Sequence, residues 1–258
     1  MSVQEDLKQF YDAEAVKYAN TREKHRSEAD IFLDEIGANE KKTLKILEFG
    51  CGGWRLLKHL AMMKNKKIEY IWVDISPELL KIAKKQIPAT NKYITCTWVC
   101  DDILNVVKLY KQETFDYIIG IASFQHIPSK KERFYLMKNF YRLLTYEGKL
   151  MMVNWSFSVW FLKKYQSNIV KAFFKCIITR GKKDRKDILV PRKSKSTIHQ
   201  RFYHIFTLGE LRNLHILSWF LTRALYYLDT KWQETKQRQT SKSTLLIAEK
   251  NVRYSETP

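Results

Sequence analysis

The sequence predicts an α/β fold: a doubly wound, mostly parallel sheet with helices on both of its faces. From about residue 44 to residue 155, runs rich in β-branched and aromatic residues alternate with helical apolar periodicity, at a period of roughly 25 residues. Most of these runs end in Gly, Asp or another polar residue, where a turn is expected. Near the C-terminus, two apolar runs on either side of a polar segment are typical of an antiparallel hairpin. We therefore expect a seven-stranded Rossmann-like sheet that closes with this hairpin.

The individual elements follow from the local pattern. Apolar residues at helical spacing predict one or two helices in residues 1–37. Ser76 followed by Pro77 predicts the start of a helix, because Ser caps helix N-termini and Pro is favoured in the first turn. The expected strands are 44–49, 67–74, 92–100, 115–123 and 149–155, the main helices lie at about 54–64, 76–87, 130–145 and 207–217, and 223–229 pairs with 243–250.

We expect one domain over residues 1–258, because the length and the single alternating pattern suit one core. Its expected parts are N-terminal helices at 1–40, a ligand-binding core at 44–155, a basic and aromatic insertion at 156–206, and a C-terminal helix and hairpin at 207–250.

Composition points to a polyanionic partner. The chain has 46 Lys and Arg against 27 Asp and Glu, a net charge of +19, which suits a nucleic acid or an anionic membrane surface. Its richness in Lys, Ile, Asn, Tyr and Phe indicates that part of this charge is compositional. No apolar run reaches the ~18 residues of a membrane span, and the first residues do not resemble a signal peptide. We therefore expect no stable membrane insertion. The four cysteines lack paired metal spacing, so we expect no metal site. Reduced thiols are then the simplest interpretation, and they suit a cytoplasmic protein.

Residues suited to ligand binding follow four of the expected strands. In doubly wound sheets the ligand lies outside the carboxyl ends of the strands, where the strand order reverses. Glycines after the first strand allow a tight turn and close approach of N–H groups, and an acid after the second suits ribose hydroxyls. The residues expected to bind the cofactor are Glu48, Gly50, Cys51, Gly52, Asp74, Ile75, Asp101, Asp102 and Ile121, and His126 follows the fourth strand.

The first turn indicates which nucleotide is bound. It reads EFGCGGW and lacks the Lys-Ser/Thr pair of a P-loop. Glu48 would repel a pyrophosphate but can pair with an ammonium or sulfonium group, which favours S-adenosylmethionine over NAD. Trp54 stands where such turns usually have their last glycine, so its indole can crowd the cofactor, swing outward or cap the pocket.

Four stretches together resemble the class I S-adenosylmethionine-dependent methyltransferases: ILEFGCGGWRLL, YIWVDISPELLKIAKK, CTWVCDDIL and FDYIIGIASFQHI. The resemblance spans residues 44–155. It implies that Gly50 and Gly52 cradle the methionine part with Glu48 close by, that Asp74 binds the ribose, and that Asp101 binds the adenine amine.

Substrate class is indicated by residues outside this core. Residues 180–201 hold nine Lys or Arg and two acids, and they follow the fifth strand, so they are expected on the cofactor side of the sheet. The segment is either a solvated loop or a clamp for a phosphate backbone.

A second resemblance favours the clamp. DILVPRK followed by RFYHIFTLGEL, with YANTREKHR near the N-terminus, resembles the tRNA wobble-uridine carboxyl methyltransferases, including the methyltransferase domain of the AlkB-homologue tRNA enzymes. In SFQHI, Gln125 replaces the first of that group's paired histidines, Arg192 replaces its Trp after Val-Pro, and the early Trp-Pro is absent. The resemblance implies methyl transfer to the carboxylate of a 5-carboxymethyl-type uridine in the tRNA anticodon loop. It also implies that a small zinc-binding activator protein can cover the apolar third strand.

A carboxylate is ionised at neutral pH, so this acceptor needs orientation rather than a general base. We expect His126 and Arg201 to act in catalysis. For Tyr203 and Phe206, core packing of the C-terminal unit is the alternative, and for His204 it is a histidine at the edge of the core that bonds the backbone. The expected substrate-binding residues are Arg22, Lys182, Lys183, Arg192, Lys193, Arg201, Tyr203 and His204.

Two other functions stay open. Residues 155–180 could form an interfacial helix of a small-molecule or quinone methyltransferase at a membrane surface. We favour a lid over the cofactor pocket for this stretch, because its apolar residues are not confined to one side. Loss of cofactor binding through Trp54 would instead leave a non-catalytic RNA-binding scaffold.

Overall fold

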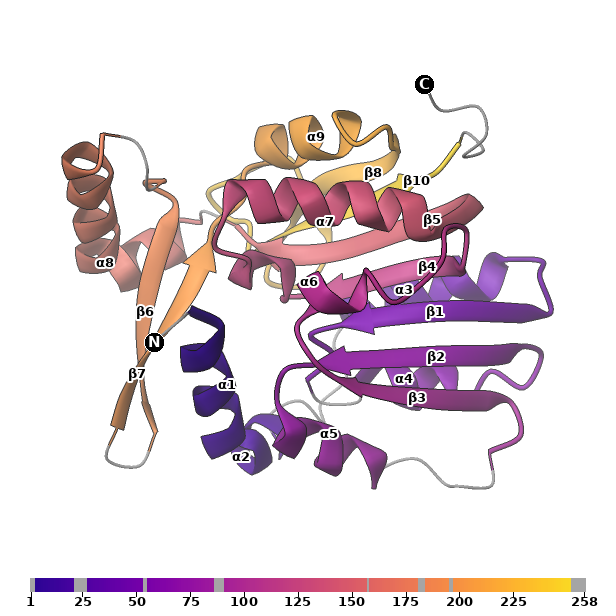
Figure 1. Cartoon of the computed structure of the whole chain (residues 1–258). Helices are drawn as coiled ribbons and strands as arrows, with labels where there is room; N and C mark the ends of the chain where they lie inside the picture. Colours follow the sequence, from indigo (N-terminus) through magenta and orange to yellow (C-terminus); the bar gives the residue numbers. More distant parts are fainter. Residues whose placement is uncertain are drawn as a thin grey trace.

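An eight-stranded sheet forms the centre of the protein (Figure 1). The computed structural model describes residues 3–20, 27–52, 55–85, 91–156, 158–180, 184–194 and 197–251. The strands of the sheet, in spatial order, are β3 (Ile94–Cys100), β2 (Lys67–Asp74), β1 (Thr43–Phe49), β4 (Phe115–Ile121), β5 (Leu144–Trp155), β10 (Ser243–Glu249), β8 (Leu221–Leu228) and β9 (Glu234–Thr235). The predicted α/β class is therefore confirmed, with eight strands rather than seven because the long polar loop contributes the two-residue strand β9.

Strand direction follows the predicted pattern. Strands β3, β2, β1, β4 and β5 pair in parallel, and β10 runs antiparallel to both β5 and β8, which confirms the C-terminal hairpin. The chain order reverses at β1, whose neighbours are β2 and β4, so a crevice is expected beyond the carboxyl ends of these strands. β5 begins at Leu144, earlier than expected, because it follows directly on the helix before it.

Helices cover both faces of the sheet (Figure 1). Side chains of β1 alternate between the faces: Leu47 and Phe49 pack on one side, and Leu44 and Ile46 pack on the other. The first face is covered by α6 (Ile103–Val106), α7 (Lys130–Leu143) and α9 (Leu208–Ile216), and the second by α3 (Ser27–Ala38), α4 (Arg55–Leu60) and α5 (Pro77–Lys84).

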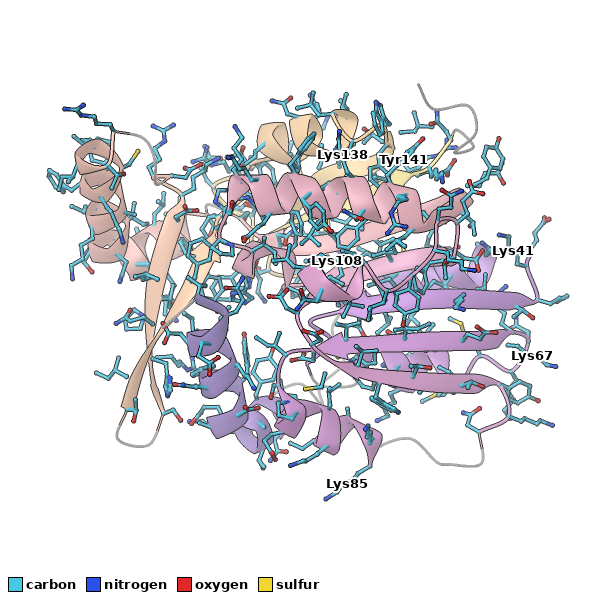
Figure 2. All side chains as sticks on the ribbon, in the orientation of Figure 1. Lys41, Lys67, Lys85, Lys108, Lys138 and Tyr141 are labelled. Atoms are coloured by element: carbon cyan, nitrogen blue, oxygen red, sulfur yellow. The ribbon has the colours of Figure 1, made fainter. Side chains whose placement is uncertain are left out.

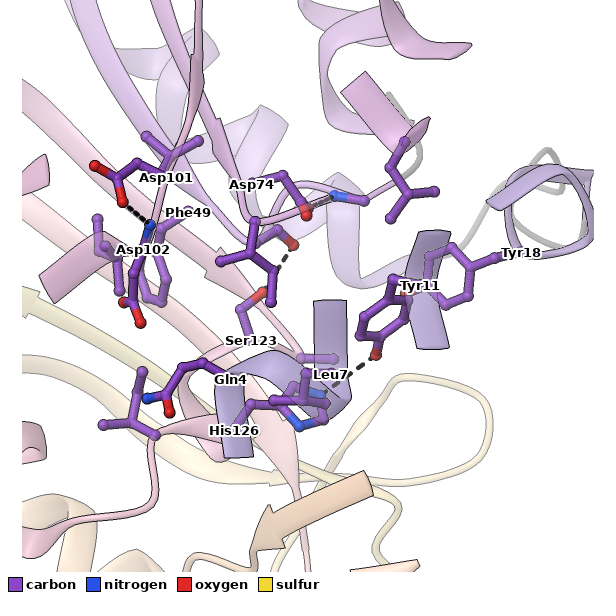
Figure 3. A pocket seen from close by; sticks show the side chains of 18 residues that line it. Gln4, Leu7, Tyr11, Tyr18, Phe49, Asp74, Asp101, Asp102, Ser123 and His126 are labelled. Carbon is purple, nitrogen blue, oxygen red and sulfur yellow. Dashed lines mark hydrogen bonds between the residues drawn. The ribbon is translucent and has the colours of Figure 1, made fainter. Parts of the chain in front are cut away.

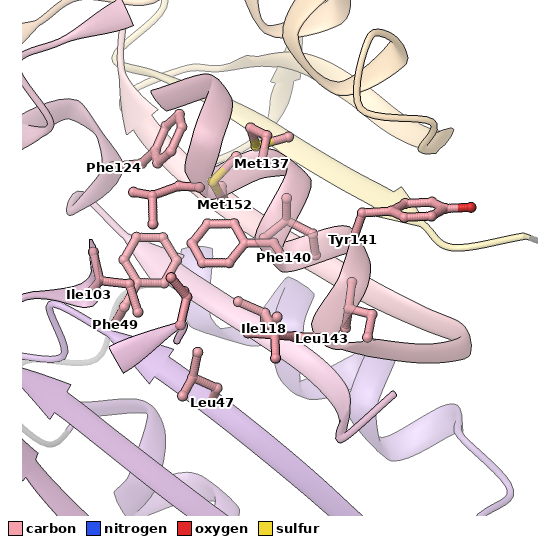
Figure 4. Close-up of a cluster of buried hydrophobic side chains, with 14 of the residues drawn as sticks. Leu47, Phe49, Ile103, Ile118, Phe124, Met137, Phe140, Tyr141, Leu143 and Met152 are labelled. Atoms are coloured by element: carbon pink, nitrogen blue, oxygen red, sulfur yellow. The ribbon is translucent and has the colours of Figure 1, made fainter. Parts of the chain in front are cut away.

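The core of the first face reaches the site (Figure 4). Phe140 of α7 stacks on Phe49 with ring centroids 5.1 Å apart, and Phe124 meets the edge of Phe49. Phe124 begins the short 3₁₀ helix η1 (Phe124–His126) that follows β4. Packing at the end of β1 therefore fixes the backbone from which the site residues project.

Two helices and two strands lie beyond the carboxyl ends of the sheet strands (Figure 1). Helix α1 (Val3–Ala13), followed by α2 (Ala15–Asn20), contacts strand β7 (Thr197–His204) on one side and α5 on the other. Strands β6 (Asp187–Ser194) and β7 form a separate two-stranded antiparallel sheet, which the sequence suggested only as a basic segment. The basic insertion thus lies on the side of the sheet where it was expected.

Helix α8 (Val159–Ile178) packs on this hairpin. Phe161 and Ala172 contact a small core with Ile188 and Val190 of β6 and Tyr203 of β7. None of the described helices has the length and apolar content needed to cross a bilayer.

Basic residues lie on several separate parts of the protein (Figure 2). Lys41 and Lys67 lie at the amino ends of β1 and β2, far from the hairpin, and Lys108 and Lys138 lie over the helical layer. Part of the net charge is therefore unrelated to the insertion.

Candidate active site

A pocket of about 700 Å³, counted with its solvent-open mouth, lies beyond the carboxyl ends of β1, β2 and β4 (Figure 3). Its walls come from the turns after these strands, from the segment after β3 and from the N-terminal helices. Six of the predicted cofactor residues line it, together with the predicted His126; these are Gly50, Gly52, Asp74, Ile75, Asp101 and Asp102.

The turn after β1 can be built only with glycine at two positions. Gly50 and Gly52 have φ angles of +60° and +54°, in the left-handed region that disfavours side chains. A Cβ on Gly50 would lie 2.4 Å from Oγ of Ser123, and one on Gly52 would lie 3.0 Å from the ring of Tyr18. The backbone of the turn is therefore exposed directly to the pocket.

Asp74 ties this turn to the next helix. Its carboxylate accepts hydrogen bonds from the backbone N–H of Gly52 and of Ser76, both at 2.9 Å. Ser76 caps α5 by accepting from Leu79 N, as predicted. Burial raises the pKa of Asp74, and the two N–H donors oppose that rise. The carboxylate keeps further lone pairs, which can accept from ligand hydroxyls.

The third wall is built by Asp101 and Asp102. Asp101 accepts from Asp102 N at 2.7 Å and from Asn105 Nδ2 at 3.0 Å, and Asp102 caps α6 through Leu104 N. Burial raises the pKa of Asp102. Ile103 and Ile75 add apolar surface, so this corner suits a flat ring with polar edges.

The fourth wall is helix α1, which the sequence did not predict as part of the site. Gln4, Leu7 and Tyr11 line the pocket from this helix. Asp12 fastens α1 to α5 by accepting from Ser76 Oγ at 2.6 Å. The periodicity of α1 showed an apolar face, but nothing in the sequence said which surface that face would cover.

At the far end of the pocket, His126 contacts the hairpin. Its Nδ1 lies 2.7 Å from the carbonyl oxygen of Phe202, which can only accept, so Nδ1 carries the proton and donates. Nε2 lies 3.5 Å from the hydroxyl of Tyr11. Burial, with a contribution from the charge of Arg201, lowers the pKa of His126 to about 4, so the imidazole is neutral at physiological pH.

An aromatic layer continues from His126 into β7. The ring of Tyr203 lies 4.6 Å from His126 and stacks on Trp155 at 4.7 Å. The guanidinium of Arg201 lies over the rings of Phe10 and Tyr203, at 4.8 and 5.2 Å. Two predicted substrate residues, Arg201 and Tyr203, do not line the pocket themselves. Tyr203 contacts the lining residue His126 and also fills the small core, as the alternative expectation had it, and Arg201 packs on Tyr203.

Three predicted cofactor residues do not line the pocket. Glu48 is buried and accepts from Tyr70 Oη at 2.7 Å. Cys51 points its thiol at Asp74, 3.8 Å away, and burial raises its pKa well above the usual value. Ile121 is half-buried at the end of β4. Glu48 and Cys51 are therefore held by contacts within the protein.

His204 lies in a different place from the one expected. It is fully buried, and its two ring nitrogens lie 2.7 Å from Asp187 and 2.8 Å from Glu210. Burial alone would raise the pKa of Glu210, but its contacts with His204 and Lys186 lower this pKa to about 2. Asp184, His204 and Glu210 could geometrically meet a metal ion, but Lys186 already contacts both acids. We assign this group as an ion-pair cluster that anchors the hairpin to α9, so His204 is not in contact with the pocket.

The remaining substrate predictions concern the basic segment. Arg192 is exposed on β6. Arg22, Lys182 and Lys183 lie outside the described residues, as does Trp54, and the side chain of Lys193 is likewise not described. The expectation of a lid formed by residues 155–180 is wrong, since no described residue of α8 lines the pocket and α1 covers it instead.

Residues 46–148 match the family model described as "Methyltransferase domain". The chain is 26% identical over 146 residues to the human protein named "Probable tRNA methyltransferase 9B", covering 57% of this chain and 28% of the relative. It is 27% identical over 136 residues to the malonyl-[acyl-carrier protein] O-methyltransferase of Bacillus anthracis, covering 52% and 46%. The aligned region thus spans less than half of either relative.

Solved structures show the same fold. An S-adenosylmethionine-dependent methyltransferase of Methanosarcina mazei superposes with a TM-score of 0.65 and 21% identity, covering 85% of this chain and 98% of that one. A complex of the Haloferax volcanii Trm112 methyltransferase activator with a protein described as a methyltransferase gives 0.62 and 12%, covering 98% and 99%. Residues 46–148 therefore carry a methyltransferase domain, and the solved structures share its fold, in agreement with the predicted enzyme class and the predicted cofactor, S-adenosylmethionine.

The pocket residues fit this cofactor. Gly50 and Gly52 both line the pocket, and their positive φ angles bring the backbone of the turn to its wall. The acids after β2 and β3 suit hydroxyl and amine donors. When bound, the cofactor supplies a methyl group on a positively charged sulfur. The protein contributes a negatively charged, partly apolar pocket that holds and orients it.

We expect Asp74→Ala to weaken cofactor binding by about 10- to 100-fold, because ligand hydroxyls and the Gly52 turn both lose a charged acceptor. Burial raises the pKa of Asp74, so binding by the parent protein should weaken as pH falls, at a higher pH than for an ordinary Asp. Isothermal titration with S-adenosylhomocysteine across pH measures both effects. Glu69→Gln, on the exposed side of β2, is the control. Unchanged affinity in Asp74→Ala would contradict the site.

We expect Gly50→Ala to abolish measurable cofactor binding and to destabilise the protein by about 1–3 kcal/mol, since it adds left-handed strain and a collision with Ser123. Gly209→Ala is the matched control, because its Cβ would meet nothing within 4 Å, and it should stabilise α9 by up to about 1 kcal/mol. Thermal unfolding with and without S-adenosylhomocysteine reports both. Equal behaviour of the two variants would contradict the strain argument.

Proposed function

We propose that this enzyme methylates the carboxylate of a 5-carboxymethyl-type wobble uridine in the anticodon loop of tRNA. The observation that carries the proposal is a buried arginine near the pocket residue His126 that has no anionic partner among the described residues. Arg201 is 8% exposed, and its Nε has no hydrogen-bond acceptor among the described residues.

A guanidinium in this position is suited to an anionic ligand. Burying a charge without a partner is costly, and the rings of Phe10 and Tyr203 compensate only in part. An incoming carboxylate would supply both charge and acceptors, and Arg binds carboxylates through two parallel hydrogen bonds. Arg201 therefore supports a carboxylate or phosphate as the group to be held here.

The neighbouring histidine supports a carboxylate as the methyl acceptor. His126 is neutral, and Tyr11 lies beside its Nε2. A carboxylate acceptor is already ionised, so no group has to remove a proton from it, and these side chains need only orient it toward the methyl group. The buried Tyr203 and the half-buried Trp155 stack on each other behind His126, so they support the position of its ring.

The nucleic-acid part of the proposal is supported by three findings. One relative is named as a tRNA methyltransferase. The chain carries a net charge of +19. The basic hairpin lies on the pocket side of the sheet, where a bound RNA would meet it (Figure 1).

A second candidate is methyl transfer to the free carboxylate of an acyl group on an acidic carrier protein. The other relative is an O-methyltransferase acting on malonyl-[acyl-carrier protein], and Arg201 would hold either carboxylate equally well. Assays with labelled S-adenosylmethionine distinguish these two candidate functions. They compare transfer of the labelled methyl group to tRNA that contains 5-carboxymethyluridine with transfer to a malonyl thioester. Nucleoside mass spectrometry identifies a methyl ester on the tRNA.

We also propose an activator protein as partner, at the outer edge of β3. β3 is an edge strand, and its side chains Thr95, Thr97 and Cys100 are exposed. The Haloferax methyltransferase of the same fold was solved with its activator. Co-expression with such an activator, followed by size-exclusion chromatography, tests this partner.

We expect Arg201→Gln to lower kcat/KM for the carboxylate acceptor by about 10- to 100-fold and to leave S-adenosylhomocysteine affinity unchanged, because it removes a charged donor from the acceptor alone. Arg201→Lys should restore part of the activity, since it keeps the charge but not the planar fork. Arg212→Gln, on the exposed side of α9, is the control. Full activity of Arg201→Gln with either acceptor would exclude the proposed role.

We expect charge reversal in the basic segment to weaken tRNA binding and to reduce the logarithmic salt slope by up to about 3, with cofactor affinity unchanged. The reversed residues are Lys182, Lys183, Arg192 and Lys193. The control reverses four exposed lysines elsewhere, namely Lys42, Lys67, Lys108 and Lys111. Filter binding at several salt concentrations measures the slope. Equal losses in both variants would mean that the whole surface, rather than the hairpin, attracts RNA.

A further inference from the structure

Helix α8 has two apolar faces, and only one of them is covered by the protein. Ala172 is buried, and Ile169 and Cys176 are half-buried; they lie at i, i+3 and i+7 on the side that packs on the hairpin. The hydrogen bond from Asn168 Nδ2 to Leu189 O, at 2.8 Å, fixes this side against β6.

The opposite side carries a second apolar stripe. Its members follow the spacing i, i+3, i+4, i+7 and i+8, so they share one face of the helix. Their exposed fractions run from 48 to 80%. This stripe, called the outer stripe here, consists of Val170, Phe173, Phe174, Ile177 and Ile178.

Five adjacent large apolar side chains in water are unfavourable and mark an interaction surface. In Figure 1, α8 projects from the hairpin away from the central sheet, so none of the central elements covers it. The outer stripe also lies apart from the pocket, which α8 does not line. The methyltransferase chemistry therefore gives no reason for this stripe to be apolar.

The charge around the stripe identifies its partner. Residues 159–180 contain five basic residues and no acidic residue. Lys171 and Lys175 are exposed and lie to one side of the stripe, and Arg180 is exposed just after the helix. A helix with exposed Phe and Ile on one face and Lys beside them is the pattern of a helix that lies in the headgroup region of an anionic bilayer.

We propose that α8 docks the enzyme on anionic lipid surfaces, with the outer stripe inserted among the acyl chain ends and the lysines at the phosphate level. The long lysine stems can follow the apolar surface while their ammonium groups reach the headgroups. RNA phosphates would account for the lysines alone, whereas a lipid surface accounts for both the lysines and the stripe. This docking is independent of the methyl acceptor proposed above.

Flotation of the full-length protein with vesicles tests the proposal. We expect binding to phosphatidylcholine vesicles that contain phosphatidylserine, weaker binding to phosphatidylcholine alone, and loss of the difference at high salt. No binding to either vesicle, or equal binding to both, would overturn it.

Two pairs of variants assign the binding to α8. Phe174→Gln with Ile177→Gln should lower vesicle affinity about tenfold or more, because it removes apolar groups while keeping good helix formers. Its control is Met62→Gln with Leu109→Gln, which removes two equally exposed apolar side chains elsewhere and should change nothing. Lys171→Gln with Lys175→Gln should reduce binding only to the anionic vesicles, and Lys67→Gln with Lys111→Gln is its control.

Affinity for S-adenosylhomocysteine and for tRNA is measured on every variant. Unchanged cofactor affinity shows that the fold is intact. If Phe174→Gln with Ile177→Gln weakens tRNA binding and leaves vesicle binding intact, the outer stripe is an RNA surface and the proposal is wrong. If both control pairs reduce vesicle binding as much as the α8 pairs, the attraction belongs to the whole surface and the proposal is wrong as well.

Discussion

The arrangement of the active site depends on the hydrogen bonds that the Asp74 carboxylate accepts. It accepts hydrogen bonds from Gly52 and Ser76, so it joins the glycine turn after β1 to the start of α5. Ser76 in turn donates to Asp12, which fastens the covering helix α1 to the same point. One buried acid therefore positions the floor, one wall and the cover of the pocket. Such a charge is tolerated because two N–H groups donate hydrogen bonds to it and because the helix N-terminus beside it is positive.

Much of the sheet could be predicted from the sequence, because strand periodicity and the residues at strand ends are local. Gly50, Asp74 and Asp101 were expected at one edge of a parallel sheet, and the structure brings them to one pocket. Glu48 shared the same local pattern but is bound by Tyr70 of the neighbouring strand. Which face of a strand end turns to the ligand depends on such cross-strand contacts, and these are not local in the sequence.

The parts that could not be predicted all depend on which surfaces meet. Helix α1 showed an apolar face but not its place over the pocket. His204 looked suited to an RNA contact, yet Asp187 and Glu210 hold it inside the anchor of the hairpin. The segment 155–180 has apolar side chains on more than one side, which suggested a lid that is covered on each of these sides. The structure covers only one side, and that single difference turns a covering element into an exposed docking surface.

The surroundings of Arg201 and His126 favour a methyl acceptor that carries a negative charge. Both side chains lie in a partly desolvated region, where an unpaired cation is costly and electrostatic contacts are strong. A phenol or carbon acceptor would bring no charge to Arg201 and would need a base, and a histidine with a pKa of about 4 is a weak one. A carboxylate removes both difficulties, since it arrives ionised and neutralises the guanidinium. Methyl transfer to the proposed carboxylate would leave a neutral ester, which loses its attraction to Arg201, so the residue proposed to hold the substrate would also favour release of the product.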